Sequence, residues 1–246
     1  MSEQRTRASS PEDLTTASLS IAQTDHMQAA DPAWTVIIPV KPAAIGKSRL
    51  GLGAELARAI ALDTVAAAVA CEAVGRVIVV TADAAFRPPG AEVLPEPAPS
   101  GIDAAVAAGA ALAGIDAPRA ALLGDLPALI PEELAAALAA ASNAGAQHPR
   151  AFVPDHESTG TTLVTALAGV ELLTAFGPAS AAKHRALGLF ELPLPAESSV
   201  RFDVDTPEQL DAALAALRRR GFIVGERVVS DGPSSPARAR RPRSPR

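Results

Sequence analysis

The sequence predicts an α/β fold, a three-layer sandwich in which helices cover both faces of a mostly parallel sheet. Short apolar runs of strand length alternate along the chain with longer amphipathic segments, the pattern of βαβ units. The hydrophobic content is 48%, much of it alanine, and only 3% of the residues are aromatic, which favours helices packed closely on a sheet. A chain of 246 residues has room for one such domain of about 200 residues with a full core.

In the first half of the domain, apolar runs and helix boundary signals predict each element. The continuous apolar run Trp34–Val40 is typical of a buried strand, and Gly75 closes the long Ala-rich segment that precedes it. Asp103 stands near the N-cap of a later helix. In order, the elements are the strand Trp34–Val40, the helix Glu55–Glu72, the strands Val77–Thr81 and Ala91–Leu94, the helix Asp103–Ala113 and the strand Ala120–Leu123.

In the second half, proline marks two helix starts. Pro131 lies in the first turn of one helix, and Thr206-Pro207-Glu208 begins another. In order, the elements are the helix Pro131–Ala141, the extended segments Ala151–Pro154 and Thr162–Leu167, the helix Ser180–Leu187, the extended segment Leu189–Leu192 and the helix Pro207–Arg219. In a sheet of this kind the functional site lies at the carboxyl ends of the strands.

Composition divides the chain into a folded domain, residues 33–228, and two flanking segments. Residues 1–32 are polar and aperiodic and predict a disordered leader, and residues 229–246 predict a disordered Arg/Pro-rich tail. The net charge is −5 although five arginines stand in the last nine residues, so the domain itself is acidic and no nucleic-acid partner is expected. No apolar run reaches membrane-spanning length and no signal region is evident, so we expect a cytoplasmic enzyme.

Only three of the 22 basic residues are lysines, and each stands where a ligand could bind. Lys41 and Lys47 bracket the loop after the first strand, and Lys183 follows a predicted helix start. Lysine offers a compact, rotatable ammonium rather than a planar fork, and phosphate is a natural partner for such a charge. With Ser48, this loop is a candidate triphosphate clamp; a plain solvated surface loop is the alternative.

Three aspartates form a candidate metal site. Asp125 follows a strand end, and Asp203 and Asp205 share one face if their segment is extended. Carboxylates on one face repel unless a cation lies between them, and oxygen ligands without His or Cys favour Mg²⁺ or Mn²⁺. The alternatives are a turn role for Asp125 and an N-cap role for Asp205.

Two Gly-containing loops are candidate anion sites. The loop 155–162 has hydroxyl residues and glycine leading into a strand, so its N–H and O–H groups could face an anion; a plain hydrophilic loop is the alternative. In Phe176-Gly177-Pro178-Ala179-Ser180, a predicted helix N-terminus could hold phosphate or carboxylate.

Several function classes are disfavoured. Gly46-Lys47-Ser48 looks like the end of a P-loop, but Lys41 stands where the first glycine is required, which argues against a P-loop-like kinase or NTPase. The sequence contains no nucleophile elbow, no His pair at helical spacing and no cysteine cluster, so Ser/His hydrolysis and zinc chemistry are poorly supported. Three carboxylates in metal-compatible places disfavour a non-catalytic nucleotide-binding module.

Taken in order, these motifs resemble one enzyme family, the 2-phospho-L-lactate / phosphoenolpyruvate guanylyltransferases of coenzyme F-420 biosynthesis. The segments that carry the resemblance are Lys41 to Leu50, Gly124-Asp125-Leu126-Pro127, Thr159-Gly160-Thr161, Phe176-Gly177-Pro178 with Ser180, and Asp203-Val204-Asp205-Thr206-Pro207. The resemblance implies a nucleotide-diphospho-sugar-transferase-like (Rossmann-like) fold. It also implies transfer of GMP from GTP to the phosphate of phosphoenolpyruvate or 2-phospho-L-lactate, with release of pyrophosphate. Sugar and molybdopterin nucleotidyltransferases are the alternative, but they usually open with a glycine-rich loop.

The resemblance also implies a role for each candidate residue. Mg²⁺ would be held by Asp125 and Asp203, with Asp205 assisting. The GTP phosphates would be held by Lys41 and Lys47, with Ser48 in the same clamp, and the phosphorylated carboxylic acid would be contacted by Thr161, Gly177 and Ser180. Asp103 stands where the family usually has Asn beside the nucleotide, so it is a further nucleotide-binding candidate.

The resemblance further implies partners. The product would pass to a downstream transferase of the same pathway. No membrane partner is expected, and a homodimer is left open. The choice among phosphoenolpyruvate, 2-phospho-L-lactate and 3-phosphoglycerate is also open. The Ala/Arg-rich, Lys-poor composition resembles that of a high-GC actinobacterium, where members of this family usually take phosphoenolpyruvate, so the resemblance favours that acceptor.

Overall fold

The computed structural model describes residues 33–41, 54–96, 101–204 and 206–219. Every predicted strand and helix is present, with ends shifted by at most three residues, whereas the predicted leader and tail lie outside the described residues. The strands are β1 (Trp34–Val40), β2 (Val74–Thr81), β3 (Glu92–Pro95), β4 (Arg119–Leu122), β5 (Arg150–Pro154), β6 (Thr161–Ala166) and β7 (Phe190–Glu191). The helices are α2 (Ala54–Ala70), α3 (Ile102–Ala113), α4 (Pro131–Ala144), α5 (Ser180–Ala186) and α6 (Pro207–Arg219), with the 3-10 turns η1 (Gly145–Gln147) and η2 (Ser199–Arg201).

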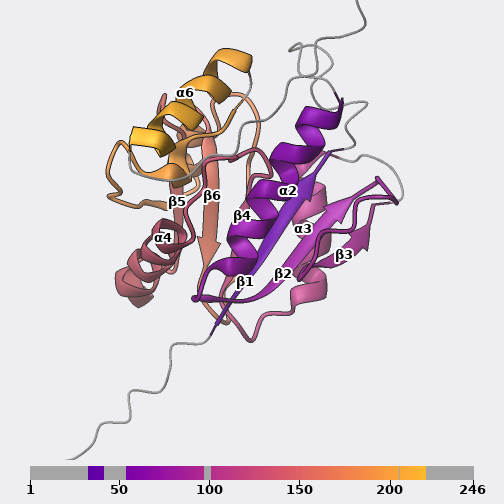
Figure 1. Ribbon diagram of the computed structural model, residues 1–246. Helices are drawn as coiled ribbons and strands as arrows, with labels where there is room; N and C mark the ends of the chain where they lie inside the picture. The colour runs from indigo at the N-terminus through magenta and orange to yellow at the C-terminus, as the bar shows by residue number, and fades with distance from the viewer. Residues whose placement is uncertain (1–32, 42–53, 97–100, 205, 220–246) are drawn as a thin grey trace, which may run out of the picture. The chain divides into compact units, whose positions relative to one another are not determined.

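The seven strands form one sheet in the order β3-β2-β1-β4-β6-β5-β7 (Figure 1). β1 pairs in parallel with β2 and β4, β2 with β3, and β5 with β7. β6 runs antiparallel to both of its neighbours, β4 and β5. The prediction of a mostly parallel sheet is therefore confirmed, with one reversed strand that makes the sheet mixed.

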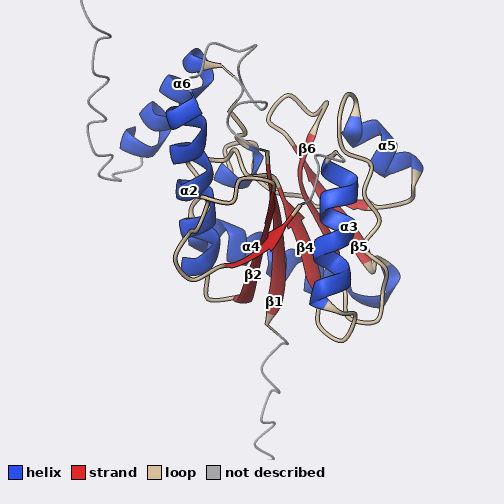
Figure 2. Ribbon diagram, turned by 90° about the vertical axis from the view of Figure 1, so that its right-hand side faces the viewer, coloured by secondary structure: helices blue, strands red, loops and turns tan. Residues whose placement is uncertain are grey.

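Helices cover both faces of this sheet, as predicted (Figure 2). Successive side chains of β1 point to opposite faces of the sheet, so the core has a part on each face. Val36 and Ile38 belong to a buried cluster with residues of α2 and α4, whereas Ile37 packs in another cluster with Ala105 of α3. α5 packs on the α3 side, and α6 adds a small cluster beside α2. Successive residues of β1 are thus buried by helices on opposite faces of the sheet. The domain therefore has three layers, with the sheet between two layers of helices.

Helix α3 approaches the sheet closely at Gly109. A Cβ atom at this position would lie 2.4 Å from Cγ2 of Ile37 and 3.2 Å from Cγ2 of Val80. Small residues therefore let α3 lie directly on β1 and β2. None of the helices within the described ranges has the length and apolar character needed to cross a membrane.

The strand order reverses between β1 and β4. The chain moves outward from β1 to β2 and β3, then returns through α3 to add β4 on the other side of β1. In open α/β sheets, ligands bind outside the carboxyl ends of the strands at such a reversal. The carboxyl ends of β1 and β4 are therefore the expected position of a ligand-binding site.

Candidate active site

Two of the predicted site residues flank the reversal of strand order. Lys41 follows the last residue of β1 and is exposed, and Asp125 lies three residues beyond β4. Gly124 fits closely between these strand ends, since a Cβ there would lie 3.2 Å from both the carbonyl oxygen of Pro39 and Cγ2 of Val40. The glycine before Asp125 thus lets the carboxylate segment lie against the end of β1.

Asp203 is held beside Asp125 by a backbone hydrogen bond. The N–H of Val204 donates to the carbonyl oxygen of Asp125 at 2.9 Å. Val204 is fully buried in a cluster with Ile60 and Ala128, which anchors this segment. The side chain of Asp203 is 19% exposed. The structure therefore brings together two segments, far apart in the sequence, that carry two of the three predicted metal carboxylates.

The segment before Asp203 is not extended as the sequence suggested. Ser199–Arg201 forms the 3-10 turn η2, in which the backbone N–H and the Oγ of Ser199 both have partners on the α4 side. The N–H of Ser199 donates to Oε2 of Glu133 at 2.6 Å, and its Oγ accepts from the N–H of Ile130 at 3.0 Å. Asp205 lies outside the described residues. This part of the predicted alternation is therefore replaced by a turn.

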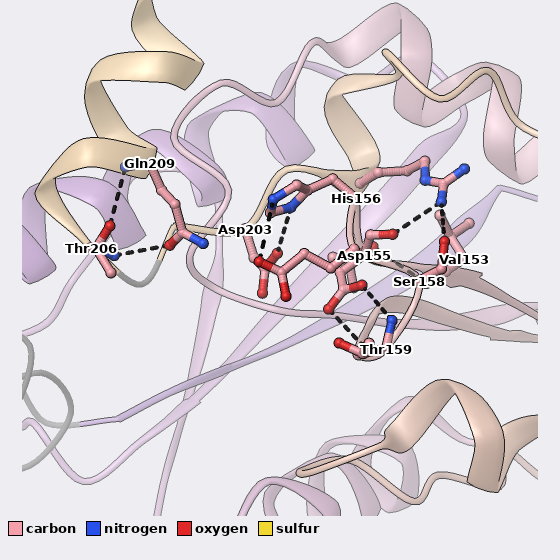
Figure 3. A network of polar contacts seen from close by, with 12 residues as sticks. Val153, Asp155, His156, Ser158, Thr159, Asp203, Thr206 and Gln209 are labelled. Carbon is pink, nitrogen blue, oxygen red and sulfur yellow. Dashed lines mark hydrogen bonds and ion pairs between the residues drawn. The ribbon is translucent and has the colours of Figure 1, made fainter.

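A capping box begins α6 just beyond this segment (Figure 3). The N–H of Gln209 donates to Oγ1 of Thr206 at 3.2 Å, and the N–H of Thr206 donates to Oε1 of Gln209 at 3.0 Å. Thr206 is therefore the N-cap of α6, the role that the sequence left open for its neighbour.

His156 lies at the site, although the sequence did not single it out. Its Nδ1 is 3.9 Å from Oδ1 of Asp203 (Figure 3). Its ring stacks on that of Phe202, with centroids 5.4 Å apart. Its backbone N–H donates to the carbonyl oxygen of Arg201 at 2.8 Å. The only signal in the sequence was its position just after a strand end, shared with many loop residues.

The loop 155–160 is ordered from within by Asp155, which is buried. Its carboxylate accepts hydrogen bonds from the N–H groups of Thr159, at 2.9 Å, and Gly160, at 2.7 Å (Figure 3). A Cβ on Gly160 would lie 2.4 Å from the same carboxylate. Two amides that the sequence offered to an anion are thus already occupied. The loop instead acts as a fixed turn that leads into Thr161.

The predicted acceptor residues lie together on the other side of β4. Thr161 is 2% exposed, and its Oγ1 is 2.9 Å from Nδ1 of His184 in α5. The N–H of Ser180 donates to the carbonyl oxygen of Gly177 at 3.1 Å, and that of Ala181 to Thr159 at 3.2 Å. α5 has only seven residues, and its first amides are used in these contacts, so the helix start does not offer the open anion site suggested by the sequence.

Asp103 lies with the acceptor residues. Its Oδ1 accepts a hydrogen bond from the N–H of Phe176 at 2.9 Å, which ties the first turn of α3 to the Phe176-Gly177 loop. The other predicted residues of the phosphate clamp, Lys47 and Ser48, lie outside the described residues. Among the described residues, the candidate site thus has Lys41 after the end of β1, Asp125 and Asp203 on two joined segments, and a group of predicted acceptor residues around Thr161.

This donor set suits a hard divalent cation. Over the described ranges, no cluster of three or more His, Cys, Asp or Glu side chains could enclose a metal ion. Mg²⁺ does not need such an enclosure, since it commonly binds one or two carboxylates together with water and substrate phosphates. Asp125 and Asp203, on segments joined by the Val204 backbone hydrogen bond, fit that requirement.

Comparison with known proteins identifies the family. No family profile matches the chain. The chain is 51% identical over 213 residues to the phosphoenolpyruvate guanylyltransferase of Streptomyces coelicolor, and the match covers 81% of this chain and 99% of that protein. It is 46% identical over 198 residues to the protein of the same name from Thermomonospora curvata, covering 76% of this chain and 85% of that protein.

Solved structures support the fold. A nucleotidyl transferase from Methanothermobacter has a TM-score of 0.53 at 16% identity, over 76% of this chain and 99% of that one. A cytidylyltransferase from Leptospira borgpetersenii has a TM-score of 0.51 at 13% identity, over 81% of this chain and 100% of that one. The fold is that of nucleotidyltransferases, and with relatives above 40% identity over most of its length the chain belongs to the phosphoenolpyruvate guanylyltransferase family.

Proposed function

We propose that the protein transfers the GMP group of GTP to the phosphate of phosphoenolpyruvate, forming a guanosyl-diphospho product and releasing pyrophosphate. The observation that carries the proposal is the backbone hydrogen bond from Val204 to Asp125, which joins the segments that contain Asp125 and Asp203 at the reversal of strand order. The name of relatives at 51% and 46% identity supplies the nucleotide and the acceptor.

The chemistry requires positioning more than proton transfer. The second pKa of a phosphomonoester is about 6, so the acceptor oxygen is already anionic near neutral pH and needs no general base. That oxygen forms a bond to the α-phosphorus of GTP, and the bond from the α-phosphorus to the bridging oxygen of the β-phosphate breaks. The site must therefore hold two anions together and stabilise the leaving pyrophosphate.

In this proposal Asp125 and Asp203 hold Mg²⁺, with Asp205 assisting. When bound, the ion would neutralise phosphate charge and orient the two phosphates. Lys41, Lys47 and Ser48 contact the GTP phosphates from the loop after β1. Thr161, Gly177 and Ser180 position phosphoenolpyruvate on the other side of β4. Asp103 supports that side through the N–H of Phe176.

The position of the product in metabolism follows from its chemistry. A phosphoanhydride between GMP and an organic phosphate is activated for transfer of the organic phosphate, with GMP as the leaving group. We therefore propose that a downstream transferase consumes it, in coenzyme F-420 biosynthesis as the sequence resemblance implies.

The test is pyrophosphate release by the full chain with GTP and Mg²⁺. Phosphoenolpyruvate, 2-phospho-L-lactate and 3-phosphoglycerate are supplied in turn, and ATP, CTP and UTP replace GTP in parallel reactions. The proposal expects the highest kcat/KM for GTP with phosphoenolpyruvate and no release without an acceptor. A preference for another nucleotide, or equal release without an acceptor, would overturn it.

A further inference from the structure

A fully buried histidine lies behind the acceptor residues. His184 is 0% exposed, and its ring lies between those of Phe152 and Phe176, with centroid distances of 5.6 and 5.5 Å. Both of its ring nitrogens have partners within hydrogen-bond distance. Nδ1 is 2.9 Å from Oγ1 of Thr161, and Nε2 accepts from the N–H of Ala175 at 2.9 Å.

These two contacts determine which nitrogen carries the proton. A backbone N–H can only donate, so Nε2 of His184 must present its lone pair to Ala175. A neutral imidazole then carries its single proton on Nδ1. Burial lowers the pKa of His184 below its ordinary value, against the opposing effect of Asp103, so the neutral form is favoured.

The tautomer in turn sets the direction of the Thr161 hydroxyl. Because Nδ1–H of His184 donates, Oγ1 of Thr161 accepts in that contact, and its own hydrogen points elsewhere. Thr161 is the first residue of β6, at the edge of the sheet where β4 ends; the carbonyl of the next residue, Thr162, accepts from the N–H of Leu123 at 2.9 Å. The hydroxyl hydrogen of this buried residue is therefore not used in the contact with His184, and Thr161 lies at the edge of the sheet that carries the candidate site.

The same ring also holds the loop that leads to Gly177. Nε2 of His184 holds the N–H of Ala175, and Oδ1 of Asp103 holds the N–H of Phe176. These consecutive amides immediately precede Gly177, whose φ of 101° lies in the region that favours glycine. One buried imidazole thus contacts both backbone segments that carry predicted acceptor residues, the start of β6 at Thr161 and the loop at Ala175.

We propose that His184 is a positioning residue that orients the Thr161 hydroxyl as a hydrogen-bond donor toward the phosphate or carboxylate of the acceptor. This inference rests on the proposed function, which assigns Thr161 to the acceptor. A donor with a fixed direction suits an anionic ligand, because the same hydroxyl turned inward would present lone pairs to it.

The tautomer can be measured without any substrate. Nitrogen-15 NMR of the labelled full chain at neutral pH distinguishes protonated from unprotonated ring nitrogens, and the His184→Gln spectrum assigns the signal. The proposal expects a neutral ring with the proton on Nδ1. An Nε2–H tautomer or an imidazolium would overturn it, whatever the activity of the enzyme.

Two conservative variants separate the two contacts of the ring. In His184→Asn the side-chain amide can still donate to Thr161 from near the Nδ1 position, whereas in His184→Gln the side-chain carbonyl can still accept from Ala175 near the Nε2 position. We expect His184→Gln to raise the KM for phosphoenolpyruvate about tenfold, the loss of one aligned contact to a charged group, with the KM for GTP unchanged. His184→Asn should lie closer to the parent.

Thr161→Val provides the double-mutant cycle. If His184 acts through the hydroxyl, Thr161→Val with His184→Gln should have the same acceptor KM as Thr161→Val alone. Melting temperatures verify that each variant folds, and His148→Gln, at an exposed residue between η1 and β5, is the matched control. Additive effects, equal rises in both KM values, or better function of His184→Gln than of His184→Asn would overturn the proposal. If the parent does not use phosphoenolpyruvate, the proposed function fails, and the NMR result still decides the tautomer.

Discussion

Asp203 is the residue on which the proposed chemistry depends most directly. Asp203→Asn removes one ligand charge and preserves the shape of the side chain, so we expect at least ~100-fold loss of kcat, since a bound metal supplies several kcal/mol to the transition state. The free energy of unfolding should stay close to that of the parent. Steady-state kinetics over a range of Mg²⁺ concentrations measure the effect.

Asp211→Asn is the matched control, because Asp211 is exposed on α6 and lies outside the candidate site. It should keep the activity of the parent. Near-normal kcat of Asp203→Asn at saturating Mg²⁺ would remove Asp203 from the metal site.

At the same scale, the sequence predicted the residues better than their contacts. Asp125 and Asp203 could be singled out because each combines a carboxylate with a strand end or a metal-compatible spacing. His156 could not, because its place beside Asp203 depends on how η2 turns the chain. The partnership of Thr161 with His184 joins positions 23 residues apart and is equally invisible in a periodic pattern.

Among the elements, α3 shows how packing can override helix propensity. Alanine is favoured over glycine in a helix by about 1 kcal/mol. Gly109→Ala, however, would place a Cβ 2.4 Å from the Ile37 side chain. Overpacking of this kind costs about 1–3 kcal/mol, so we expect a net loss of up to about 2 kcal/mol in the free energy of unfolding, measured by urea denaturation.

Ala108→Gly, one position away on the exposed side of α3, measures the propensity contribution alone and should cost about 1 kcal/mol. A Gly109→Ala variant that gains the stability lost by Ala108→Gly would mean that α3 can move away from the sheet without cost.

The elements also show where prediction from sequence stopped. The alternation of apolar runs and amphipathic segments was enough to place the strands and helices, because burial imposes period 2 or 3.6 on the side chains. The direction of β6 was not predictable, since a buried strand has the same pattern whether it runs parallel or antiparallel. That direction nevertheless positions the site, because it brings the first residue of β6, Thr161, to the edge where β4 ends.

At the scale of the whole molecule, the site is assembled from segments that only the sheet order brings together. The end of β1 supplies Lys41, the end of β4 supplies Asp125, and a distant segment supplies Asp203 through the backbone of Val204. Asp155 and its loop then connect this group to Thr161 and α5. The buried contacts that join this loop, Thr161 and α5 therefore contribute both to global stability and to the geometry of the predicted acceptor residues.

That link predicts a pH dependence of global stability. Burial lowers the pKa of His184 in the folded protein, with Asp103 acting against the shift and Lys183 adding to it, whereas the unfolded chain takes up the proton at the ordinary value of about 6.5. Above that value neither state is protonated and the contribution is complete. As the pH falls below it, the unfolded state binds the proton first, so the free energy of unfolding decreases. The stability advantage of the parent over His184→Gln should therefore shrink between pH 7.5 and 5.5 in urea unfolding, and an advantage that stays constant or grows would show that His184 is not held neutral by the fold.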